Sequence, residues 1–170
     1  PFDPNSKPVH PDGRTATMYD PIRETIHHEN GGSTVTDRYV DDNGWQNQSR
    51  NVRDAKGRII ESNWQNDQGS SYSSKIEYDD ANRTSVEKEV WVNKDGQTTS
   101  ATTYKEYREN GKILSERIVN GNSTTERKYG EDGKIISEVN YEVHDNSTPH
   151  NQEGEHIPTK PEEEHDEREP

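Results

Sequence analysis

Short acidic turns are the residues of this sequence best suited to binding a metal ion. They lie at Asp41-Asp42-Asn43, Asp79-Asp80 and Glu131-Asp132. Because Ca²⁺ takes several oxygen ligands from Asp, Asn and backbone carbonyls, these turns could coordinate calcium. Asp and Asn are also the residues that turns prefer, and no run has the regularly spaced acidic loop of a calcium-binding hand. We therefore expect no cofactor, with calcium in the acidic turns as the alternative.

Histidines form a second candidate for metal binding. His27 and His28 are adjacent, and four more histidines stand in the acidic end of the chain: His144, His150, His156 and His165. Neutral imidazole binds Zn²⁺ and Cu²⁺. The four are six to nine residues apart, so no two of them share one turn of a helix. We expect a solvated tail with weak metal affinity and no dedicated metal site.

The sequence contains no arrangement that points to catalysis. Glycoside hydrolysis needs two carboxylates at a fixed separation, one of them with a raised pKa in a buried pocket. The chain has 34 acidic residues and little apolar material with which to build such a pocket, so no pair stands out. The Gly-x-Ser-x-Gly elbow of Ser-His-Asp hydrolases is also missing. We expect a non-enzymatic protein with no catalytic and no cofactor-binding residues.

Three tryptophans are the candidate partner-contact residues: Trp45, Trp64 and Trp91. Each stands near a turn, where an exposed ring could stack on a sugar or on an apolar side chain of a partner protein. In a chain this poor in aliphatic residues, the same rings would also serve as the core. We expect the core role, and keep partner contact as the alternative.

A regular series of turns positions all of these residues. Between Glu29 and Gly133, turns of Asn, Asp and Gly recur about every 10 to 15 residues, with runs of Thr, Ser, Ile, Val and Tyr between them. The stretch Tyr107–Glu116 recurs 22 residues later as Tyr129–Glu138. Each copy carries Asn-Gly or Asp-Gly, then Lys and two aliphatic residues. Asn-Gly and Asp-Gly favour hairpins with type I′ turns, in which both central residues have positive φ.

Alternation between the turns predicts strands. Tyr72, Ser74, Ile76 and Tyr78 would share one face of a strand, as would Val86, Lys88, Val90 and Val92. A helix would need apolar residues at steps of three and four. We therefore predict an all-β antiparallel hairpin meander of about eight to ten strands, with a thin core that suits a single-layer or twisted sheet, and disordered termini.

Composition divides the chain into three parts. Residues 1–16 contain four prolines and are expected to form an extended, mobile arm. Residues 17–143 carry the hairpin repeats. Residues 144–170 hold seven of the thirteen net negative charges and four prolines, and are expected to be disordered. The core is thin because Leu, Ile, Val and Phe together make only 22 of 170 residues.

Several partner classes conflict with the composition. A net charge of −13 with scattered Lys and Arg disfavours nucleic acid. No apolar run approaches the ~18 residues of a membrane helix, so we expect no membrane insertion. The absence of cysteine fits a reducing cytosol or a disulfide-free surface protein of bacteria. Because the chain begins with Pro1 and not with methionine, we expect a processed form or a fragment.

The turn units resemble tyrosine–aspartate (YD) repeats, which build Rhs-like toxin shells and teneurins. The closest matches are Tyr78-Asp79 and Val52–Ile60, and the pair Tyr107–Ile113 and Tyr129–Ile135 is similar. Most copies lack the Tyr-Asp pair, and the spacing varies. The chain also resembles the short Gly-Lys β-hairpin repeats of bacterial antitoxin-like and surface proteins. Both resemblances span residues 17–143 and imply a hairpin array used as a scaffold or binding surface; neither implies catalytic residues.

From these observations we expect an extracellular or cell-surface structural or adhesive protein. It would bind a protein partner or itself, and the two open edges of a meander would allow assembly by β-strand addition. Residues 1–16 or 144–160 of one copy are candidate donor strands, although prolines limit the first. The alternative is a soluble acidic binding module that neutralises a basic partner protein, as immunity or antitoxin-like proteins do.

Overall fold

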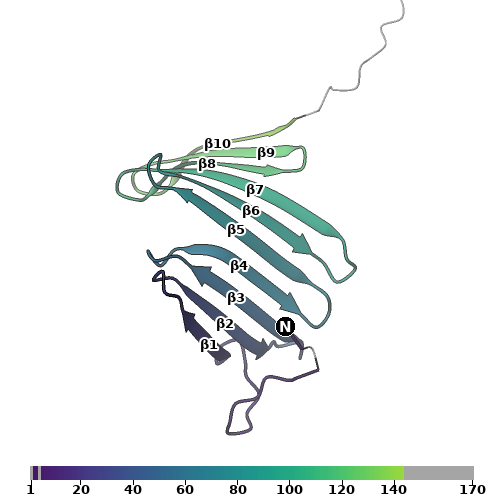
Figure 1. The fold of residues 1–170 in the computed structure, drawn as a ribbon. Helices are drawn as coiled ribbons and strands as arrows, with labels where there is room; N and C mark the ends of the chain where they lie inside the picture. Colours follow the sequence, from purple (N-terminus) through teal and green to yellow (C-terminus); the bar gives the residue numbers. More distant parts are fainter. Residues whose placement is uncertain (1, 4, 144–170) are drawn as a thin grey trace, which may run out of the picture.

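The protein is one open antiparallel sheet of ten strands, in the computed structural model that describes residues 2–3 and 5–143. Each strand pairs with its neighbour in sequence, so the prediction of an all-β antiparallel meander is confirmed (Figure 1). The strands are β1 (Ile22–His27), β2 (Ser33–Val40), β3 (Gln46–Arg53), β4 (Ile59–Asn66), β5 (Ser71–Asp79), β6 (Thr84–Val92), β7 (Thr98–Tyr107), β8 (Ile113–Asn120), β9 (Ser123–Tyr129) and β10 (Ile135–Glu142). The described residues form no helix long and apolar enough to cross a membrane.

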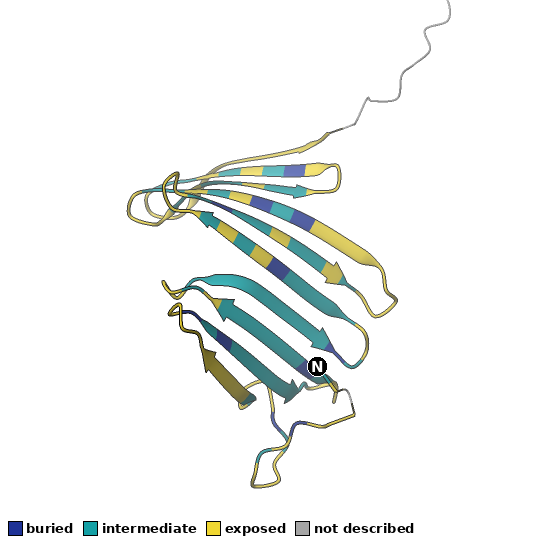
Figure 2. Cartoon of the chain, viewed as in Figure 1, coloured by how far each residue is buried: buried dark blue, intermediate teal, exposed yellow. Residues whose placement is uncertain are grey.

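The sheet is a single layer, and its core is as thin as the composition predicts. Two alanines, Ala16 and Ala101, are the buried hydrophobic residues of the described chain. The other buried positions are polar and mostly small: Thr34, Asn47, Asn66, Ser74, Ser85, Thr103 and Thr124. Most of the central strand residues are only half-buried (Figure 2). Stability must therefore come from backbone ladders and from side-chain pairs between neighbouring strands.

Strand register divides the side chains between two faces. Trp64 lies opposite Tyr72, and Tyr72 lies opposite Trp91, so three aromatic rings line up across β4, β5 and β6. We call this side of the sheet the aromatic face. The other side carries Val86, Val90, Tyr104 and Val139, and we call it the aliphatic face. A one-residue slip in register would exchange the two faces, so the pairing is strongly specified where the rings meet.

All nine connections fall at the turns that the sequence predicts, but the turn type differs from the prediction. In the loop after β7, Arg108 N–H bonds Lys112 O and Gly111 N–H bonds Arg108 O. Gly111 has φ of +79°, whereas Asn110 does not have a positive φ. This is a type I turn followed by a left-handed glycine, not a type I′ turn. Seven other loops of the described chain repeat this bonding pattern, with glycines 13, 31, 44, 57, 69, 96 and 133.

An Asp or Asn oxygen completes each of these eight turns by accepting the last N–H of the loop. In four turns the acceptor is the first residue of the loop: Asp41, Asp54, Asn66 and Asn93. In the other four it is the third residue: Asp12, Asn30, Asn110 and Asp132. The Asp and Asn residues therefore act as local acceptors that hold the turn closed.

The repeated Gly-Lys-Ile segment also encodes a bulge. After Gly111 and Gly133, register shifts place two residues of β8 and β10 opposite one residue of the preceding strand. The segment Gly57-Arg58-Ile59-Ile60 produces the same shift between β3 and β4. An extra residue increases local twist. The duplicated sequence thus specifies the turn, the bulge and the twist as one unit.

Part of the segment expected as an extended arm is folded. Val9 forms a bridge with Thr15 around a tight turn at Gly13, and Ala16 O accepts a bond from Val40 N–H at the end of β2. Ala16 is fully buried. Residues 8–16 therefore cap one end of the sheet. Residues 144–170, expected to be a disordered tail, lie outside the described residues.

Candidate functional site

The structure brings two of the three candidate tryptophans together on the aromatic face. Trp64 and Trp91 flank Tyr72, and the rings of Tyr72 and Trp91 are 5.5 Å apart at a tilt of 46°. Trp45 stands apart from these strands, in the turn before β3. Trp45 and Trp91 are 39% and 38% exposed, and Trp64 is half-buried. These rings therefore pack between strands and also leave a surface that a partner could contact.

A buried asparagine, which the sequence did not single out, links the tryptophans. Asn47 is 2% exposed. Its Nδ2 donates to Asp41 Oδ2 at 3.0 Å and to Trp45 O at 2.9 Å, and its Oδ1 accepts from Trp64 Nε1 at 3.0 Å. Because the β2–β3 turn, β3 and β4 meet through this one amide, it fixes where Trp64 lies. In the sequence, Asn47 is one of many Asn residues, and only the register identifies its partners.

Tyr72 is fixed by its hydroxyl as well as by its ring. The hydroxyl donates to Glu89 Oε1 at 2.8 Å, on the neighbouring strand β6. Burial, together with this carboxylate, raises the pKa of Tyr72 to about 12. The phenol therefore stays neutral at physiological pH and holds the ring against Trp91.

A second cluster lies on the aromatic face of β8, β9 and β10. Arg127 Nη1 is 3.1 Å from Glu116 Oε1, and Arg127 Nε donates to Glu138 Oε2 at 2.6 Å. The hydroxyl of Tyr129 also donates to Glu116. Hydrogen bonds from both carboxylates, that of Glu138 first, raise the pKa of Arg127 above its ordinary value. This network joins the last three strands and is structural in character.

The acidic turns are occupied by protein donors. Asp41 accepts from Asn43 N–H, Trp45 N–H and Asn47, and Asp79 accepts from the N–H and side chain of Asn82. Within the described ranges no three His, Asp or Glu side chains gather closely enough to hold a metal ion. His28 Nε2 lies 2.8 Å from Thr34 Oγ1, and His27 is exposed at the end of β1. The candidate histidines from His144 onward lie outside those ranges. This geometry does not favour calcium, which stays the alternative for the acidic turns, and the expected absence of a metal site stays a prediction.

Asp80 predicts a measurable dependence of stability on pH. Hydrogen bonds from Arg58 and then Lys56 lower the pKa of Asp80 from 3.8 to about 2. A carboxylate with a lowered folded pKa stabilises the fold above its unfolded value, and this contribution disappears as the pH falls through the folded pKa. We expect Tm to fall between about pH 5 and about pH 2, and to fall less steeply in Asp80→Asn. Thermal melts across this range test the difference.

The control for that series is Asp42→Asn, which removes an exposed carboxylate from another turn between strands. It should reproduce the pH slope of the unmodified protein. If Asp80→Asn also kept that slope, the ion pairs of Asp80 with Arg58 and Lys56 would contribute nothing to acid stability.

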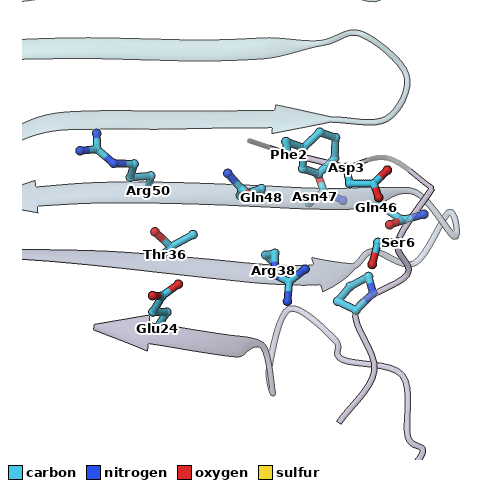
Figure 3. A pocket seen from close by; sticks show the side chains of 11 residues that line it. Phe2, Asp3, Ser6, Glu24, Thr36, Arg38, Gln46, Asn47, Gln48 and Arg50 are labelled. Atoms are coloured by element: carbon cyan, nitrogen blue, oxygen red, sulfur yellow. The ribbon is translucent and has the colours of Figure 1, made fainter. Parts of the chain in front are cut away.

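Residues near the N-terminus, from Phe2 to Pro8, line one side of a polar groove on the aliphatic face of β1–β3. Phe2 lies over β3 near Gln48, while Arg38 and Thr36 project from β2 and Arg50 projects from β3 (Figure 3). The groove has a volume of about 440 Å³. Its walls are mostly amides, hydroxyls, guanidinium groups and carboxylates, which can hydrogen-bond a polar ligand, and its apolar lining comes from Phe2 and Pro8. Arg50 is already paired with Glu61 at 2.7 Å.

Comparison with known proteins adds no family to this picture. No protein-family model matches the chain, and no curated protein matches it. The resemblance to YD repeats and to short Gly-Lys hairpin repeats therefore remains a hypothesis. The structure establishes the architecture, which is an open single-layer meander with β1 and β10 as its two outer strands.

Proposed function

We propose that this chain is a non-enzymatic structural or adhesive protein of the cell surface or extracellular space, which binds protein partners through the edges of its sheet. The proposal rests on one observation, the exposure of the outer strand β10. All eight of its residues are exposed, and no described strand pairs with its outer edge. Exposed apolar side chains continue along it, with Ile136 69% exposed and Val139 53% exposed.

Such an edge is unusual for a protein that does not use it. Natural sheets protect their edges with charged side chains, especially Lys, with Pro, with short strands or with bulges, because unpaired N–H and C=O groups recruit other strands. β10 contains neither Lys nor Pro, its charged residues are Glu138 and Glu142, and its bulge is confined to the start of the strand, between Ile135 and Ser137. From Ser137 to Glu142 the edge is regular, which suits strand addition by a partner.

The backbone of Asn140 allows a direct test. Val143 N–H bonds Asn122 O toward β9, so alternation places the N–H of Asn140 on the outer side. Asn140→Pro should remove that donor and block strand addition while keeping the β9–β10 ladder, since proline is tolerated on the outside of an edge strand. Light scattering after size-exclusion chromatography should show mass rising with concentration in the unmodified full chain, and at least about a tenfold higher onset concentration in the variant.

Asn140→Ala is the matched control. It loses the same side-chain bond from Thr125 but keeps the backbone N–H. We expect it to assemble like the unmodified chain. If proline and alanine had the same effect, the outer edge of β10 would not be the binding surface.

A second candidate is the acidic binding module that neutralises a basic protein. The net charge of −13 favours it, because opposite charge accelerates association and disfavours unwanted partners. A chain that remains a monomer at every concentration would move the proposal to this function. Its partner would then be sought by affinity capture with a salt-dependent wash.

A further inference from the structure

The two outer edges of the sheet match in strand direction. The ten strands alternate strictly, so β1 and β10 run in opposite directions. A second copy placed beside the first, with its β1 against β10, would therefore pair antiparallel. Its sheet would continue the meander without reversing either face. The even number of strands makes this continuation geometrically simple.

The outward-pointing N–H and C=O groups of the two edge strands also occur at positions that can pair. Directly after β1, His28 N–H bonds Gly32 O toward β2, so alternation turns the N–H and C=O groups of Thr25 and His27 outward. Directly after β10, Val143 N–H bonds Asn122 O toward β9, so alternation turns the N–H and C=O groups of Glu138 and Asn140 outward. These residues can therefore form the hydrogen-bonded pairs of a new ladder.

All four outward residues lie on the same face, the aromatic face. The register leads across the sheet from Thr25 through Val35, Asn51, Ser62, Ser74 and Glu89 to Ala101. Thr103, two residues along the same strand, continues through Ile118 and Thr125 to Asn140. Pairing β1 with β10 would thus join the aromatic faces of two copies, and likewise their aliphatic faces.

We propose that the β10 edge binds the β1 edge of a second copy of this chain, with Asn140 opposite Thr25. This inference rests on the proposed function and names its partner. In this register Glu138 lies opposite His27, Glu142 lies opposite Arg23, and Val139 lies opposite Ile26. The opposite charges of Glu142 and Arg23 and the apolar pair of Val139 and Ile26 would both stabilise the ladder, and the His27 imidazole could donate a hydrogen bond to Glu138. A shift of two residues either way would set Glu24 opposite a valine and separate Glu142 from Arg23.

Symmetric pairing of two identical edges fits less well. β10 carries Glu138 and Glu142 and no cation, so two β10 strands would bring carboxylates together. Two β1 strands would bring together the side chains of Arg23 and His27 on the aromatic face. A β1–β10 contact is head-to-tail, and such contacts form filaments or rings, not closed dimers. The growing mass expected above would then have no fixed upper limit.

Single-cysteine variants test this register, because the chain has no cysteine of its own. Val139 and Ile26 would form a non-hydrogen-bonded pair, whose short Cα separation suits a disulfide. Mixing full-length Val139→Cys with Ile26→Cys under mild oxidation should give a covalent heterodimer. Tyr141→Cys with Ile26→Cys is the control offset by one pair, and should react at least about tenfold more slowly.

The outcomes separate this inference from the proposed function. A disulfide that joins two copies of Val139→Cys in preference to the mixture would show symmetric β10 pairing and overturn the head-to-tail register. Mass growth without the 26–139 disulfide would also overturn it, while leaving edge binding intact. A mass that stays monomeric at all concentrations would overturn both proposals.

Discussion

Replacing Asn47 with leucine is expected to lower the free energy of unfolding by about 2–4 kcal/mol. The substitution removes three hydrogen bonds at a position that is 2% exposed. It leaves Trp64 Nε1 without its acceptor, and it removes one donor each from Asp41 and Trp45 O, which keep only backbone N–H donors. Each polar group left buried and unpaired costs about 1–3 kcal/mol, whereas the added methyl groups gain little in so thin a core.

Urea denaturation followed by tryptophan fluorescence measures this loss, because Trp64 is bonded directly to Asn47. The matched control is Asn43→Leu, which places the same side chain at an exposed position of the same turn. It should change stability by less than about 0.5 kcal/mol. Equal effects of the two variants would mean that Asn47 does not hold the turn and the strands together.

Replacing Arg127 with methionine is expected to cost about 2–3 kcal/mol. Arg127 bonds Glu116 and Glu138, on the strands at either side of its own. The Glu116 side chain is only 9% exposed, so removal of the guanidinium leaves a largely buried carboxylate that keeps a hydrogen bond from the hydroxyl of Tyr129. Methionine keeps the apolar stem, so the loss should reflect the ion pairs and not packing.

The control is Lys128→Met, which removes the adjacent cation from the opposite face, where that side chain is exposed. It should be nearly neutral, within about 0.5 kcal/mol, because single exposed charges contribute little. Hydrogen exchange adds spatial information, since Arg127→Met should open the β9–β10 ladder before the centre of the sheet. If β3–β5 lost protection equally, Arg127 would not act locally.

Strand positions could be predicted from the sequence because two local signals agree there. Alternation identifies each strand, and Asn-Gly, Asp-Gly or a similar pair marks each end. The turn type was wrong for a physical reason: the same dipeptides serve type I′ turns and type I turns closed by a left-handed glycine. The informative residue is an Asp or Asn that accepts the last loop N–H, such as Asp54 for Arg58 N–H.

The side-chain networks could not be predicted, because their members meet only through register. Asn47 and Trp64 are 17 residues apart in sequence, and Arg127 lies 11 residues from each of its carboxylate partners. Nothing in the local sequence near Asn47 distinguishes it from the exposed Asn43. The tryptophan prediction was too simple in one respect, since Trp91 both packs against Tyr72 and remains partly exposed.

Light scattering of the full chain over a wide concentration series tests the central claim most directly. The account predicts that the mass rises steadily with concentration and does not stop at a dimer. Because the acidic turns are filled by protein donors, added Ca²⁺ or a chelator should leave the curve unchanged. A mass that stays at one chain throughout would contradict assembly through the sheet edges.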